Sequence, residues 1–324
     1  MDFSFCILKG NGDQLQLNFN LKNSYFWAKL SSTTLLSIFS LICFSTASFA
    51  GDPFRTTNPR NISTQTESAF KALFEDGNYP QAKVYLNEAK NSSEDDPLLP
   101  ALRASLAYTE QDWEIMETYT AETLKVAKLI ASKDPLRSNL YLAVGNFLDG
   151  ANEYRKKGGL AALSKLQLVF DYFDKAERID KNDPELNLIK GYLNLMLAVN
   201  LPFSSPQQAI DNLQAYASPQ YLVNRGIALA YRDLKDYDLA LTFVNKAIES
   251  TPLNPELYYL KGQILRQKGQ KENSVTLLQE AVKNFDIALA KVNQLPQEGV
   301  KKPLEREKRK TLEKIAELGT SSQN

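Results

Sequence analysis

A motif of small and large apolar residues recurs at a spacing of 34 residues in the last third of the chain. Small side chains allow two helices to cross closely, and a large apolar residue three or four places further on fills the space between them. A period of this length is typical of a solenoid of helical hairpins, in which each hairpin buries its apolar face against its neighbours. The motif positions are Ala228, Tyr231, Ala240, Val244 and Ala247, and then Gly262, Leu265, Ser274, Leu278 and Ala281.

A second correspondence extends this register upstream. Residues 183–186 (DPEL) match residues 254–257 (NPEL), and Lys190-Gly191 matches Lys261-Gly262, each 71 residues apart. This spacing is two periods plus three residues. The pattern predicts an all-α solenoid of about six helical hairpins over residues 64–295. Residues 150–159, with Arg155-Lys156-Lys157 between glycines, are expected to form an insertion within the third hairpin.

The motif resembles the tetratricopeptide repeat (TPR) family, which places small residues at positions 8, 20 and 27 of the repeat. Here these are Ala228, Ala240 and Ala247, with Tyr231 and Pro252 at the family's aromatic and proline positions. The next copy departs from the pattern at its aromatic, second small and proline positions. The resemblance implies a right-handed superhelix with a C-terminal capping helix. Residues 183–232 are also similar to a group of exported TPR proteins of photosynthetic bacteria.

The resemblance further implies a peptide-binding groove lined by the first helix of each hairpin. Aromatic, Arg and amide side chains at these positions are typical of protein-binding surfaces. The TPR clamp for a terminal carboxylate is absent from the pair of repeats where Arg225 fits it, because Leu229 and Glu256 occupy two of its other positions. The expected groove residues are Tyr108, Asn146, Tyr192, Arg225, Arg232, Tyr259, Gln263 and Arg266.

Residues 1–50 carry the features of a secretory signal. Residues 30–50 are uncharged, follow Lys22 and Lys29, and end in Ser48-Phe49-Ala50, which predicts cleavage between Ala50 and Gly51. The apolar run is shorter than the ~20 residues of a membrane span, although an uncleaved membrane anchor is the alternative. We expect translation to start at Leu21, read as methionine. These features predict Sec-type export to the periplasm, and the resemblance to exported proteins of photosynthetic bacteria implies the thylakoid lumen as a second possible location.

The two ends of the exported chain differ in pattern. Residues 51–63 contain two prolines and several Thr and Asn, which predicts a disordered lead-in. Residues 296–324 are expected to hold a linker, a capping helix over residues 302–318 and a disordered tail. Such a helix has one apolar face and stops further stacking.

Composition excludes several functions. The chain has 38 basic and 38 acidic residues, which gives no electrostatic reason to expect nucleic acid as a partner. It has no histidine, and both cysteines precede residue 50, so hydrolytic triads and His/Cys zinc sites are excluded after cleavage. We therefore expect no enzyme activity, cofactor or metal. The sequence predicts a protein-binding scaffold or assembly factor, and the alternative is a carrier of a small apolar or pigment-like ligand held by Tyr192, Leu195, Met196 and Leu229.

Overall fold

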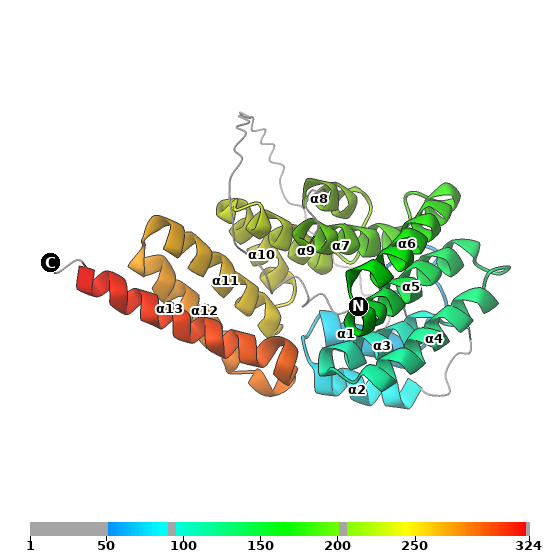
Figure 1. Cartoon of the computed structure of the whole chain (residues 1–324), viewed down its shortest axis with the longest axis horizontal. Helices are drawn as coiled ribbons and strands as arrows, with labels where there is room; N and C mark the ends of the chain where they lie inside the picture. Colours follow the sequence, from blue (N-terminus) through cyan, green and yellow to red (C-terminus); the bar gives the residue numbers. More distant parts are fainter. Residues whose placement is uncertain (1–50, 90–94, 201–205, 322–324) are drawn as a thin grey trace, which may run out of the picture.

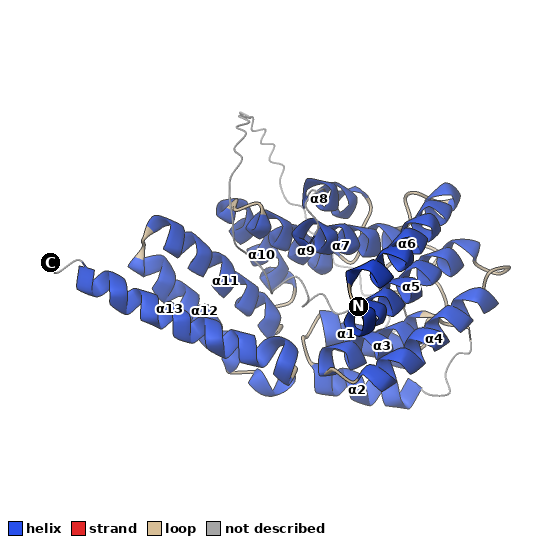
Figure 2. Cartoon of the chain, viewed as in Figure 1, coloured by secondary structure: helices blue, strands red, loops and turns tan. Residues whose placement is uncertain are grey.

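The computed structural model describes residues 51–89, 95–200 and 206–321, so the predicted signal peptide lies outside the described residues. Within these ranges the chain is helical and contains no β-strand (Figure 2). The helices form six consecutive hairpins and a final single helix, which confirms the expected all-α solenoid (Figure 1). The first helices of most successive hairpins contact one another. We call the first helices of the six hairpins the inner layer and the second helices the outer helices.

The hairpins differ in length, although each pairs two antiparallel helices in sequence order. The first three are α1 (Thr64–Phe74) with α2 (Tyr79–Glu88), α3 (Leu98–Glu110) with α4 (Trp113–Leu129), and α5 (Pro135–Lys157) with α6 (Gly159–Ile179). The last three are α7 (Pro184–Asn200) with α8 (Pro206–Ala215), α9 (Gln220–Asp233) with α10 (Tyr237–Ser250), and α11 (Pro255–Glu272) with α12 (Val275–Leu289). Two short helical turns, η3 (Val292–Gln294) and η4 (Gln297–Lys301), lead into α13 (Lys302–Ser321).

Four of the hairpin turns share one local design. A residue with positive φ lies between the two helices, and the next residue caps the second helix by accepting a backbone N–H. A short polar side chain at the capping position satisfies one of the free N–H groups at the start of the helix. The pairs are Gly77-Asn78, Gln111-Asp112, Lys235-Asp236 and Asn273-Ser274.

The expected insertion at residues 150–159 is wrong, because α5 continues as a helix to Lys157 and only Gly158, at φ 82°, breaks it. Tertiary contacts hold these last turns of the helix. The Arg155 guanidinium lies 4.8 Å from the centre of the Trp113 ring, and Lys156 forms an ion pair with Glu117 of α4. The last hairpin ends at Leu289, short of the expected bound at residue 295.

Residues 51–63 are packed against the inner layer and are not the disordered lead-in that their composition suggests. We call this segment the strap. Phe54 and Ile62 are buried, and the Phe54 ring meets the Phe70 ring edge-on at 5.0 Å. The strap is therefore part of the hydrophobic core and not a tail.

The two ends of the solenoid meet. The Tyr79 hydroxyl of α2 donates to Glu256 Oε1 of α11 at 2.9 Å, and Asn254 Nδ2 donates to the Phe74 carbonyl at 3.2 Å. Beside these contacts, η3 lies against α2 and η4 against α3. In Figure 1 the orange start of α13 accordingly approaches the cyan first hairpin. Repeats of a simple solenoid contact only their neighbours, so the repeat pattern alone does not predict this contact between the ends.

Candidate functional site: the inner helix layer and its strap

All eight predicted groove residues lie on inner-layer helices, from α3 to α11. Their side chains, however, mostly face neighbouring helices. Six of them are buried, and only Tyr108 and Arg266 remain partly exposed. Tyr108 packs edge-on against Trp113, and Asn146 Nδ2 donates to the Leu142 carbonyl of its own helix at 2.7 Å. Contact of these residues with a partner remains a prediction.

From α7 onward, buried groove residues form hydrogen bonds from one inner helix to the next. Tyr192 of α7 donates to the Leu222 carbonyl of α9 at 2.8 Å, and Arg232 of α9 donates to Gln263 Oε1 of α11 at 3.1 Å. The series ends at α13, where Glu307 Oε1 accepts from Tyr259 at 2.9 Å and from Gln263 at 3.1 Å. These bonds fix how the inner helices are aligned, because a buried polar group left unpaired is costly.

Two glutamates that are not among the predicted groove residues are central to this layer. Glu185 and Glu256 are the equivalent residues of the two matching segments, 183–186 and 254–257, and both are buried. Glu185 accepts from the Tyr141 hydroxyl at 2.6 Å and from Arg60 at 2.8 Å. Glu256 likewise accepts from a tyrosine hydroxyl, as described above, and from Arg225 at 3.0 Å. The 71-residue correspondence could have identified both glutamates, because each stands at the same position of its segment.

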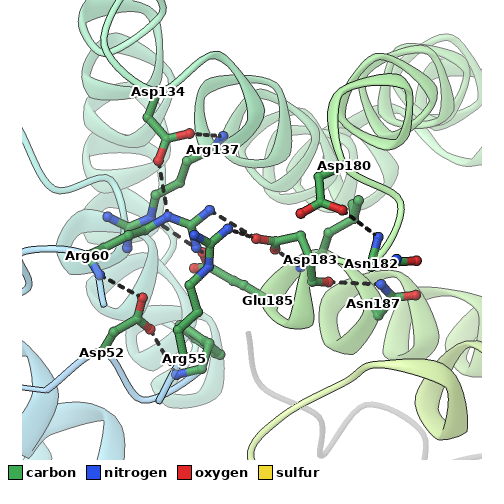
Figure 3. A network of polar contacts seen from close by, with 12 residues as sticks. Asp52, Arg55, Arg60, Asp134, Arg137, Asp180, Asn182, Asp183, Glu185 and Asn187 are labelled. Carbon is green, nitrogen blue, oxygen red and sulfur yellow. Dashed lines mark hydrogen bonds and ion pairs between the residues drawn. The ribbon is translucent and has the colours of Figure 1, made fainter. Parts of the chain in front are cut away.

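An ionic network joins the strap to the inner layer (Figure 3). The Arg60 guanidinium contacts three carboxylates: Nε lies 3.0 Å from Asp134 Oδ2, Nη1 lies 2.8 Å from Glu185 Oε2, and Nη2 lies 3.1 Å from Asp183 Oδ2. Arg55 also pairs with Asp183. A guanidinium suits this position because its fixed fork of donors can serve several carboxylates at once.

Arg137 continues the network from the strap toward the start of α3. Its Nη2 lies 3.0 Å from Asp96 Oδ1, and its Nε lies 3.4 Å from Glu185 Oε2. Burial raises the pKa of the Asp96 carboxyl, and Arg137 partly opposes that shift. Burial also raises the pKa of the Tyr141 phenol well above its ordinary value, and the Glu185 charge adds to this. Tyr141 therefore stays a proton donor.

Two hollows lie near this layer. A cleft of about 640 Å³ is bordered by α8, α9 and α10, with Tyr216, Phe243 and Lys246 among its lining residues. An apolar cavity beside Phe54 and Tyr141 has only about 40 Å³. Neither of these two hollows is lined by Tyr192, Leu195, Met196 or Leu229, so the carrier site stays a prediction.

The described residues contain neither a candidate membrane-spanning helix nor a candidate metal site. None of the helices in the described ranges is long and apolar enough to cross a membrane. No group of three or more Asp, Glu, His or Cys side chains there is arranged to hold a metal ion.

This geometry defines a helical-repeat solenoid whose inner helices are joined by polar contacts. Residues 226–252 and 255–284 match the tetratricopeptide repeat family, so the chain contains tetratricopeptide repeats. Such repeats generally mediate protein–protein interaction and are typically non-catalytic. No curated relative matches the chain.

Proposed function

We propose that the protein is a non-catalytic scaffold or assembly factor that binds a segment of another protein on its inner helix layer. One observation carries this proposal: the strap, a segment without helical structure, already packs on this layer. Phe54 and Ile62 anchor the strap by burial, and Arg55 and Arg60 pair with carboxylates of the inner layer. Apolar anchors combined with charged, geometrically specific pairs are what peptide recognition uses.

We further propose that the scaffold works in the periplasm or the thylakoid lumen. The uncharged run after Lys22 and Lys29, and the Ser48-Phe49-Ala50 ending, support Sec-type export. A chain without cysteine after residue 50 also needs no disulfide, so its fold suits an oxidising compartment as well as a reducing one. Retention by an uncleaved N-terminal anchor is the competing outcome, which fractionation of membranes and soluble envelope contents distinguishes.

The binding proposal is tested by photo-crosslinking, which avoids disrupting the buried polar contacts. A photoreactive amino acid is placed at Tyr108 or Arg266, the two partly exposed inner-layer positions. Matched controls are the exposed outer-helix residues Glu122 of α4 and Lys283 of α12, and a third site is Tyr216 in the cleft. Each variant is irradiated in the native envelope, and adducts are identified by mass spectrometry.

We expect one defined protein to be crosslinked from the inner-layer positions and not from the outer helices. Adducts from Tyr216 alone would move the binding site to the cleft and contradict the inner-layer assignment. The same background from all positions would contradict the scaffold itself.

A further inference from the structure

The strap begins with a contact between its first backbone nitrogen and a carboxylate of α1. Gly51 N donates to Glu67 Oε2 at 2.7 Å, and the Glu67 side chain is 16% exposed. A Cβ atom at residue 51 would lie 3.3 Å from Glu67 Oε1, so any larger residue would force the carboxylate to shift. Glu67 also pairs with the half-exposed Lys71 at 2.6 Å.

The peptide bond before Gly51 is the one at which the sequence predicts cleavage. We propose that processing between Ala50 and Gly51 creates an amino terminus that Glu67 binds, so Glu67 is a binding site for the α-ammonium group of the mature chain. This inference rests on the export step proposed above. Its chemistry is hydrolysis by a leader endopeptidase: water adds its hydroxyl to the Ala50 carbonyl carbon and a hydrogen to the Gly51 nitrogen. The new amine then takes up a proton, because an ordinary α-amine has a pKa of about 7.7–8.0.

Cleavage changes the chemistry of the contact while its geometry is already in place. Before cleavage the Gly51 nitrogen is a neutral amide with one N–H, and afterwards it is a cation with three. A charge-assisted hydrogen bond is about twice as strong as a neutral one. The neighbouring residues hold this end of the strap in position, since Asp52 accepts from the backbone N–H groups of Phe54 at 2.9 Å and Arg60 at 3.1 Å. Processing thus completes the docking of the strap.

The test compares purified protein that begins with a free Gly51 amine and the same protein acetylated at that nitrogen, which removes the charge. Each form is made with Glu67 and with Glu67→Gln, and thermal unfolding is measured for all four. We expect acetylation to lower the Tm by about 2–4 °C when Glu67 is present and to change it little in Glu67→Gln. Glu88→Gln, at an exposed site on α2, is the control and should keep the full acetylation effect.

Equal Tm values for the free and acetylated forms would overturn the proposal, as would an equal loss with and without Glu67. Because the effect of acetylation on the Tm is measured within each variant, any general effect of Glu67→Gln on the stability of α1 cancels. The intact mass of the protein recovered from its native envelope tests the processing step in the cell. We expect the mass of a chain that begins at Gly51, and a mass that corresponds to a different amino terminus would overturn this step. Neither the unfolding temperatures nor the intact mass depends on a partner protein. The crosslinking experiment can therefore fail while these measurements succeed, and the reverse.

Discussion

Glu185 and Glu256 each divide their two carboxylate oxygens between a tyrosine hydroxyl and an arginine. A buried carboxylate is costly unless its charge is paired and its lone pairs are occupied. Each glutamate is therefore stable in the core only when the neighbouring elements place a tyrosine hydroxyl and an arginine beside its carboxylate. Repetition of this arrangement 71 residues apart explains why the DPEL and NPEL segments match, although they lie in hairpins of different length.

Gly262 gives a residue-scale prediction. A Cβ atom there would lie 2.4 Å from Phe285 Cε1 and 3.2 Å from the Ala281 carbonyl oxygen. Gly262→Ala is therefore expected to lower the free energy of unfolding by about 1–3 kcal/mol through overpacking, despite the better helix propensity of alanine. Gly319→Ala, in open space on α13, is the matched control and should stabilise slightly. Urea denaturation measures both, and a stabilised Gly262→Ala variant would contradict the close approach of the helices.

Asp134 gives a second prediction, which depends on pH. Burial alone would raise its pKa, but the backbone N–H of Arg137 and the charge of Arg60 bring the pKa below its ordinary value. A lowered pKa contributes stability at neutral pH that is lost as the pH falls through the folded-state value. Asp134→Asn keeps the capping acceptor and loses the charge, which should cost about 1 kcal/mol at pH 7.

The measurement for Asp134 is urea denaturation between pH 7 and about pH 3, which lies below the ordinary Asp pKa of about 3.9. The difference between wild type and Asp134→Asn should shrink as the pH falls. Asp134→Ala also loses the α5 cap and should remain less stable than Asp134→Asn, by about 1 kcal/mol, at every pH. A constant difference between wild type and Asp134→Asn would show that the charge has no role.

At the scale of elements, the strap shows where sequence patterns fail. Its prolines, threonines and asparagines indicate disorder locally, yet Phe54 and Ile62 are buried by helices distant in sequence. Arg55 and Asp183 are 128 residues apart, so no local pattern relates them. The C-terminal turns of α5 were missed for a similar reason, because Arg155 is held by Trp113 of another hairpin. By contrast, the small residues at Ala228 and Gly262 were predictable, since the period itself specifies where helices cross.

The strap's two arginines give the element-scale prediction. Arg60 has a side chain 9% exposed and serves three carboxylates, whereas the Arg55 side chain is 23% exposed and serves one. Arg60→Ala removes one cationic partner from each of the buried carboxylates of Asp183 and Glu185 and should cost about 3–5 kcal/mol, while Arg55→Ala should cost clearly less. Hydrogen exchange should also accelerate at residues 52–62 in Arg60→Ala. A smaller loss for Arg60→Ala than for Arg55→Ala would contradict the central role of Arg60.

At the scale of the whole molecule, the contact between its two ends is the feature that the repeat pattern does not contain. The period predicts how each hairpin stacks on the next, but the total curvature depends on every junction along the chain. Hairpins of different length and the η3–η4 connection bring the ends together in a way that no single repeat specifies. Asn254 reaches the first hairpin only because Gly77, at φ 62°, leaves space for it.

Tyr79→Phe tests this closure, and Tyr141→Phe is a control of the same chemistry. Each substitution removes one hydroxyl that donates to one of the two equivalent glutamates, but Tyr79 bridges the ends of the molecule while Tyr141 joins the consecutive inner helices α5 and α7. Both should cost about 1–2 kcal/mol, because a buried acceptor loses a partner. Only Tyr79→Phe should accelerate hydrogen exchange at residues 254–257 and 292–301, since these segments lie against the first hairpin. If both variants change exchange there equally, the end-to-end contact does not hold the solenoid closed, and its curvature is set by the hairpin junctions alone.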